Sequence, residues 1–279
     1  MGTSRELTLA DGRALRVHDT GRGAALTVVW HHGTPQTGAL LAPLVEAADA
    51  RDIRVISYGR PGYGGSTGLP GRTVASAAED VRQLADALGV GEFASMGTSG
   101  GGPHALACAA LLPDRVRGVV CYASVAPYTE EFDWYAGMAD SGGLRAGREG
   151  REARLAHGAT AEFNEDSFLP VDWKTLESTW SSLGKDAGAA SASAEAQADD
   201  DVAFASPWGF DLTAVTAPVL LAQGGADRVI PASHAESLLH GLPNAELWLR
   251  PRDGHISVLE TVPLTLDWLL ALRRRVRRP

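Results

Sequence analysis

Long apolar runs, a positive charge balance and paired cysteines are all missing from this sequence. The chain lacks an early apolar run of about 20 residues, so we expect neither a signal peptide nor a transmembrane span. Its formal charge of −9 argues against nucleic acid or an anionic membrane as a partner. The arginine cluster at 273–278 is the exception, and we expect it to close a final helix that begins near Pro263, where cations favour the helix dipole. A cytoplasmic globular protein is therefore predicted.

Metal and disulfide patterns are also missing. The adjacent His31 and His32 are accompanied by neither an HExxH motif nor paired-cysteine spacing, and neighbouring side chains point apart on a strand. Cys108 and Cys121 fall on an expected core helix and core strand, where cysteine behaves as a small apolar residue. We predict no metal, no organic cofactor and no disulfide.

What the sequence does contain is a serine in the setting that nucleophilic catalysis requires. Residues 97–101 read Gly-Thr-Ser-Gly-Gly, between a short apolar stretch at 92–96 and a helical stretch at 102–112. A serine on such a sharp strand-to-helix turn is held in a strained conformation, and the flanking glycines relieve the crowding. This pattern also arises by chance in a chain with 32 glycines, so its weight comes from the flanking strand and helix. Ser99 is the predicted nucleophile.

The partners of this serine follow it in the chain order that the arrangement requires. Asp227 lies in the loop that leaves an apolar strand at 217–223, and His255 follows the strand at 245–249. Each residue alone reads equally well as a turn former or a helix cap, and Asp253 is a rival acid. Because open α/β sheets gather their sites at the carboxyl ends of the strands, we predict a triad of Ser99, His255 and Asp227.

An oxyanion hole is predicted beside the serine. The apolar strand at 26–30 runs into His-His-Gly-Thr-Pro at 31–35. The tetrahedral intermediate of acyl transfer needs two fixed backbone N–H donors. The expected donors are Gly100, which follows the nucleophile, and Thr34.

Strand patterns stop between 127 and 208, where only helical and loop-like stretches occur. We predict a core of residues 1–126 and 209–279, and a helical cap of residues 127–208 over the strand ends. Ten of the 18 aromatic residues lie in this cap, so that some should line an apolar pocket. We favour Phe132, Trp134 and Tyr135, which follow soon after the exit from the core, as substrate-binding residues. The polar, alanine-rich stretch 185–201 is expected to be an exposed, mobile helix that acts as a lid.

With these residues the chain resembles the α/β-hydrolase superfamily over nearly its whole length, in particular its bacterial esterase and proline iminopeptidase branch. Residues 60–66 look like the family's loop after the strand at 53–57, and residues 206–211 look like the re-entry from cap to core. The resemblance implies an eight-stranded, mostly parallel sheet with helices on both faces, and the same triad and oxyanion donors. Many members carry an acidic residue immediately before this loop, where this chain has Gly59, which implies the loss of a loop anchor. The segment after His32 lacks the extra glycines of proline iminopeptidases.

We therefore predict a serine hydrolase that forms an acyl-enzyme with a small to medium hydrophobic carboxylic ester or lactone. Alternatives with the same triad are an aminopeptidase or amidase, a C–C bond hydrolase and a cofactor-free perhydrolase. A non-catalytic ligand-binding member of the fold is an alternative of another class. The serine nucleophile disfavours epoxide hydrolases and haloalkane dehalogenases, which use an aspartyl ester. The expected partner is a small-molecule substrate, and the sequence leaves a homo-oligomer open.

Overall fold

The computed structural model describes residues 2–21 and 23–276, which form one mostly parallel sheet. The strand order is β1-β2-β4-β3-β5-β6-β7-β8, in which β2 runs antiparallel to β1 and β4 and the remaining pairs are parallel. This confirms the predicted eight-stranded architecture. The strands are β1 (Thr3–Thr8), β2 (Ala14–Asp19), β3 (Leu26–His31), β4 (Ile53–Tyr58), β5 (Phe93–Thr98), β6 (Val116–Tyr122), β7 (Val219–Gly224) and β8 (Ala245–Arg250).

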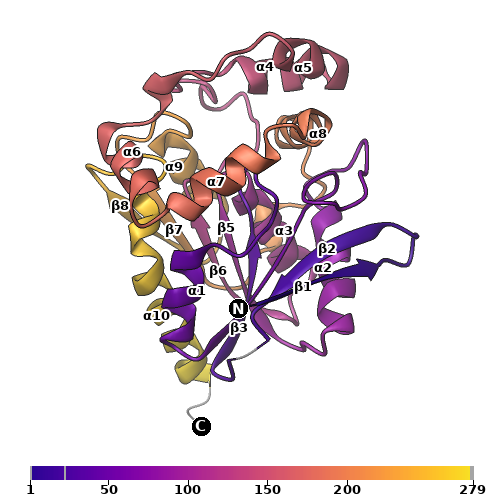
Figure 1. Ribbon diagram of the computed structural model, residues 1–279. Coiled ribbons are helices and arrows are strands. Elements are labelled where there is room, and N and C mark those ends of the chain that lie inside the picture. Colours follow the sequence, from indigo (N-terminus) through magenta and orange to yellow (C-terminus); the bar gives the residue numbers. More distant parts are fainter. Residues whose placement is uncertain (1, 22, 277–279) are drawn as a thin grey trace.

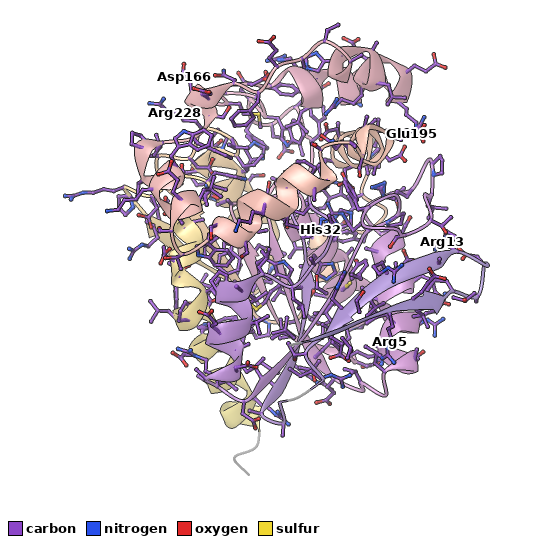
Figure 2. The ribbon with its side chains drawn as sticks, viewed as in Figure 1. Arg5, Arg13, His32, Asp166, Glu195 and Arg228 are labelled. Carbon is purple, nitrogen blue, oxygen red and sulfur yellow. The ribbon has the colours of Figure 1, made fainter. Side chains whose placement is uncertain are left out.

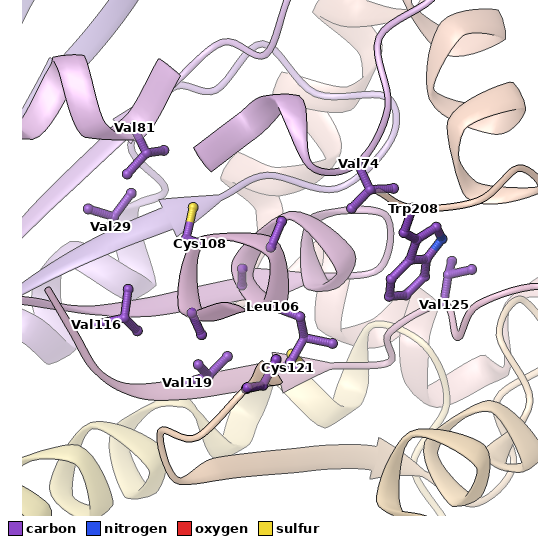
Figure 3. Close-up of a cluster of buried hydrophobic side chains, with 14 of the residues drawn as sticks. Val29, Val74, Val81, Leu106, Cys108, Val116, Val119, Cys121, Val125 and Trp208 are labelled. Atoms are coloured by element: carbon purple, nitrogen blue, oxygen red, sulfur yellow. The ribbon is translucent and has the colours of Figure 1, made fainter. Parts of the chain in front are cut away.

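Helices cover both faces of the sheet, which is why the central strands are continuously apolar. Side chains alternate along each strand, so Val29 packs in one buried cluster while Val28 and Trp30 pack in the other. Figure 3 shows part of the first cluster, in which Cys108 and Cys121 lie among apolar side chains as free, buried cysteines. One face carries α2 (Ser76–Ala87), α3 (Gly101–Leu111) and α9 (Ala232–Gly241), and the other carries α1 (Ala42–Asp49) and α10 (Val262–Val276).

The segment between β6 and β7 contains only helices and loops. All of residues 127–208 are described, and none of them forms a strand. We call these residues the insertion. Figure 1 shows its helices gathered at the end of the molecule opposite the C-terminus. They are α4 (Gly142–Glu149), α5 (Arg151–Gly158), the 3₁₀ turn η1 (Glu165–Ser167), α6 (Pro170–Glu177), α7 (Ser181–Ala190) and α8 (Ala194–Phe204).

The expectation for residues 185–201 was wrong in two respects. The stretch is divided between two helices, α7 and α8, and its acidic end is buried rather than exposed. Its role as a lid stays a prediction. The three consecutive carboxylates of Asp199, Asp200 and Asp201 are 5%, 0% and 9% exposed. Each pairs with arginine, which is how a polar sequence enters the interior.

Two short 3₁₀ turns remain: η2 (Leu212–Ala214) precedes β7, and η3 (Ser257–Thr261) precedes α10. The predicted final helix is present as α10, whereas positions 277 and 278 of the arginine cluster lie outside the described residues. Across the described residues, every helix is too short or too polar to cross a membrane.

Candidate active site

Ser99 stands directly after β5 in a strained conformation. Its φ is +53°, in the left-handed region that non-glycine residues rarely occupy. Its N–H donates to Tyr122 O at 2.8 Å, and its carbonyl accepts from Gly102 N at 3.0 Å, which closes the turn into α3. A Cβ on Gly101 would lie 2.1 Å from His31 O, so β3 and the start of α3 approach this closely only because residue 101 is glycine. The strained turn predicted from the sequence is present.

His255 and Asp227 meet at the same edge of the sheet, in the loops after β8 and β7. The imidazole Nδ1 lies 2.8 Å from Asp227 Oδ2, and the two side chains are 7% and 0% exposed. The other carboxylate oxygen accepts from Val229 N at 2.8 Å and Ile230 N at 2.9 Å, so Asp227 is held rigidly. With Nδ1–H donating to the carboxylate, the ring's Nε2 carries the free lone pair. The rival acid Asp253 instead binds Arg250 at 3.0 Å.

Two opposing effects act on the pKa of His255. Burial lowers it, but the charge of Asp227 and the hydrogen bond to it outweigh burial, and Asp172 adds to the effect, so the pKa lies above the usual histidine value. No hydrogen bond within the described residues joins Ser99 Oγ to His255. Such catalytic contacts often tighten only when substrate is bound.

The loop after β3 lies against the serine turn. A Cβ on Gly33 would be 3.6 Å from Ser99 Cβ, and one on Gly100 would be 2.7 Å from Thr34 Oγ1. Gln36, which the sequence analysis missed, fixes this loop by accepting from Gly33 N at 3.0 Å. Within the described part of the chain, the backbone N–H groups of Thr34 and Gly100 make no hydrogen bond. Two unused donors therefore flank the serine, as an oxyanion requires.

A buried carboxylate from the insertion reaches this loop. Asp200 of α8 accepts from Thr34 Oγ1 at 2.7 Å, Arg60 Nη2 at 2.7 Å, Arg72 Nη2 at 2.6 Å and Tyr63 Oη at 3.0 Å. Burial raises the pKa of the Asp200 carboxyl, but the two guanidiniums more than reverse this and hold it well below its usual range. The group is ionised, and it balances the charge of one arginine. The loop of Arg60, for which Gly59 implied a lost anchor, is thus anchored from another part of the chain.

The two adjacent histidines have packing roles. His32 Nδ1 lies 2.6 Å from Gly33 O, and its Nε2 accepts from Arg60 N at 3.0 Å (Figure 2 shows His32 in the interior, beneath the insertion helices). His31 lies between Ser95 Oγ at 2.9 Å and Tyr58 Oη at 3.2 Å. Burial lowers the pKa of both rings well below the usual value, so they are neutral. The described residues contain no group of three or more side chains that could hold a metal ion.

Two aromatic residues that the sequence analysis did not select lie beside the predicted site residues His255 and Gly100. The ring of Phe168 lies parallel to that of His255, at 6.4 Å between centroids and 12° between planes. Phe204 lies beside Gly100, because a Cβ there would be 2.7 Å from Phe204 Cζ. Its ring also packs edge-on against His104 at 5.8 Å. Both belong to the aromatic excess of the insertion, but neither is close in sequence to the exit from the core.

The three aromatics that were selected lie together where the insertion leaves the core. Phe132 and Trp134 pack against the ring of His234 at 5.4 and 5.5 Å, and Trp134 is 1% exposed. Tyr135 lies beneath the guanidinium of Arg145, 3.9 Å from its ring centroid. A contact of these three with substrate stays a prediction.

Comparison with known proteins identifies relatives of the whole chain. A family model described as the alpha/beta hydrolase fold matches residues 27–262. A pimeloyl-[acyl-carrier protein] methyl ester esterase of Nitrosomonas europaea is 28% identical over 249 residues, covering 88% of this chain and 94% of that protein. A putative carbamate hydrolase of Caulobacter sp. (strain K31) is 27% identical over 267 residues, covering 88% and 89%. Among solved structures, the bromoperoxidase from Bacillus anthracis shares the fold with a TM-score of 0.72 at 24% identity, over 100% of both chains.

Proposed function

Since this chain belongs to the alpha/beta hydrolase family and is a hydrolase, we propose that it is a serine esterase acting on small to medium hydrophobic carboxylic esters or lactones. The observation that carries the proposal is the His255–Asp227 hydrogen bond at 2.8 Å, at the strand edge where Ser99 is held with a φ of +53°. An oriented base and an exposed hydroxyl on a strained turn are what nucleophilic acyl transfer requires.

In the proposed reaction, His255 Nε2 takes the proton of Ser99 Oγ while that oxygen attacks the carbonyl carbon of the ester. The N–H groups of Thr34 and Gly100 hold the oxyanion, and Asp227 stabilises the imidazolium that forms. His255 then gives its proton to the leaving alkoxide, which leaves an acyl group on Ser99. Water, deprotonated by the same imidazole, hydrolyses this acyl-enzyme, and neither a metal nor an organic cofactor takes part.

The surroundings favour an uncharged, hydrophobic substrate. Phe168 beside His255 and Phe204 beside Gly100 would form apolar walls close to the reacting carbonyl. The charges nearest the oxyanion loop, on Arg60, Arg72 and Asp200, are buried and bonded to one another. We propose the insertion, residues 127–208, as the cap over a core of residues 1–126 and 209–279. Phe132, Trp134 and Tyr135 would then shape the base of that cap.

The relatives favour an ester first and a carbamate second. One relative is named a methyl ester esterase, and its coverage of nearly both chains supports the ester. Another relative is named a putative carbamate hydrolase. Carbamates react through the same acyl chemistry, so they are the second candidate substrate class. A panel of matched esters, lactones, carbamates and amides distinguishes the two.

The test is labelling with a fluorophosphonate, followed by peptide mass spectrometry. We expect a single adduct on Ser99 and none in Ser99→Ala, together with a loss of ester turnover on the order of 10⁶-fold in that variant. Folded protein that takes no adduct and hydrolyses no ester would refute the proposed function and favour a non-catalytic ligand-binding role.

A further inference from the structure

The loop that carries His255 is tied to the insertion by one buried carboxylate. Asp172 of α6 is 0% exposed, and its Oδ1 accepts from Ile256 N at 3.0 Å, Ser257 N at 2.8 Å and Ser257 Oγ at 2.8 Å. Ser257 Oγ in turn accepts from Gly254 N at 2.8 Å. The backbone on both sides of His255 is thus connected, directly or through one hydroxyl, to Asp172.

This contact requires a glycine immediately before the histidine. A Cβ on Gly254 would lie 2.0 Å from Asp172 Oδ2 and 2.8 Å from its Cγ, distances that no real side chain tolerates. The carboxylate therefore lies against the bare backbone of residue 254. Gly254 and Asp172 form one close contact between the core and the insertion.

Helix capping does not account for this arrangement. Asp172 lies in the first turn of α6, where its Oδ2 accepts from Leu169 N at 3.0 Å, and this bond alone satisfies the usual role of an acid there. The second oxygen takes three further donors from a loop more than 80 residues away in sequence. A fully buried carboxylate with four donors costs substantial desolvation energy, which a surface helix cap would not require.

We propose that Asp172 is a positioning residue for the general base, supplied by the insertion to hold the loop of His255 so that its imidazole lies between Asp227 and Ser99. This inference rests on the proposed function and deepens it. The insertion then contributes to the rate of the reaction as well as to the walls of the substrate pocket. Misplacing a catalytic group by about 1 Å costs on the order of 10²-fold in rate.

The charge of Asp172 gives this role its own signature. Two carboxylates act on the His255 ring, Asp227 from the loop after β7 and Asp172 from α6, while Phe168 covers the ring with an uncharged face. Both charges raise the pKa of the imidazole. In Asp172→Asn a single amide oxygen replaces two accepting oxygens, so hydrogen bonds at this contact are lost together with the charge. The pH at which the base loses its proton must then fall.

The test compares Asp172→Asn with Asp199→Asn, a matched change of another buried carboxylate of the insertion, one that pairs with Arg151 away from the His255 loop. For both variants and the wild type, kcat and KM for a p-nitrophenyl ester are measured from about pH 5 to about pH 9. We expect Asp172→Asn to lose about 10²-fold in kcat, with KM within about threefold of wild type and the acid limb displaced to lower pH. Asp199→Asn should match the wild type in all three quantities.

The outcomes separate this inference from the function on which it rests. A wild type that takes the fluorophosphonate adduct, with an Asp172→Asn variant of unchanged kcat and unchanged acid limb, would overturn the inference and leave the esterase standing. A wild type that is inert toward esters and fluorophosphonate would overturn both. If Asp172→Asn does not fold, Ser257→Ala removes the hydroxyl between Gly254 and the carboxylate and leaves the charge in place. We expect a several-fold loss of kcat with an unmoved acid limb, and an unchanged kcat would count against the proposal.

Discussion

Replacing Asp200 by asparagine should destabilise the protein far more than any other carboxylate-to-amide change in α8. The Asp200 side chain is 0% exposed, and the guanidiniums of Arg60 and Arg72 that pair with it are 1% and 2% exposed. An amide in its place keeps an acceptor oxygen for Thr34 or Tyr63 but carries no charge. Two buried arginines would then share no counter-charge.

The magnitude follows from the burial of these groups. Removing one partner of a buried ion pair typically costs about 3–5 kcal/mol, because the remaining charge is left desolvated. With two arginines affected, we expect a loss of about 4–5 kcal/mol in the free energy of unfolding. For a chain of this size the urea dependence is about 3 kcal/mol/M, so the unfolding midpoint should fall by about 1.5 M.

Urea unfolding followed by circular dichroism at neutral pH measures this loss, with Asp199→Asn as the control. The arginine that pairs with Asp199 is 34% exposed, so the control should lose no more than about 1 kcal/mol. A loss below about 1 kcal/mol in Asp200→Asn, or equal losses in both variants, would refute the reasoning that Asp200 is the dry counter-charge of Arg60 and Arg72.

Three further predictions follow from the site and its surroundings. The kcat/KM for an ester should rise with pH through a limb above the usual histidine pKa of about 6.5, because the neutral imidazole is the base. Asp227→Asn should move this limb to lower pH and reduce kcat on the order of 10⁴-fold. A limb that does not move would contradict the role of Asp227. Burial lowers the pKa of His234 to about 4, so the unfolded chain binds a proton more readily than the folded chain. The free energy of unfolding should therefore fall by about 3 kcal/mol between pH 6.5 and pH 4. Thermal unfolding should show this as a drop in Tm, and the drop should be smaller in His234→Gln. Gly101→Ala should lower the free energy of unfolding by about 1–3 kcal/mol and remove most ester turnover, because its Cβ would meet His31 O at 2.1 Å. Gly91→Ala, where nothing lies within 4 Å of the added Cβ, should leave stability and turnover unchanged. Equal thermal stability of the two variants would contradict this reasoning.

Local sequence patterns were sufficient to predict the central strands, whereas the eight-stranded sheet was implied by the family resemblance. The central strands are short apolar runs, and the serine turn is marked by glycines whose replacement would collide with backbone. Asp227 was chosen over Asp253 because it follows a strand of its own, whereas Asp253 lies two residues from His255; the structure pairs Asp227 with His255 while Asp253 binds Arg250. These features are visible because each depends on residues close in sequence or on a fixed order of strands.

The contributions of the insertion were missed because their partners are far away in sequence. Asp200 was assigned to an exposed helix, since nothing near it shows that Arg60 and Arg72 lie more than 120 residues upstream and pair with it. Asp172 was not singled out for the same reason, because its partners Ile256 and Ser257 lie more than 80 residues downstream. The aromatics were chosen by their closeness in sequence to the core exit, a criterion that could not select Phe168 and Phe204, which lie beside His255 and Gly100.

Asp172 of α6 and Asp200 of α8 also limit which parts of this chain can be exchanged with those of a relative. A chimera that received a relative's whole insertion would gain new pocket walls, but it would leave the His255 loop and Arg60 without the acceptors that Asp172 and Asp200 provide. Helices α4 and α5 instead contact α8, inside the insertion itself. Arg151 and Arg154 of α5 pair there with Asp199 and Asp201, so α5, α6 and α8 would have to be inherited together with the core.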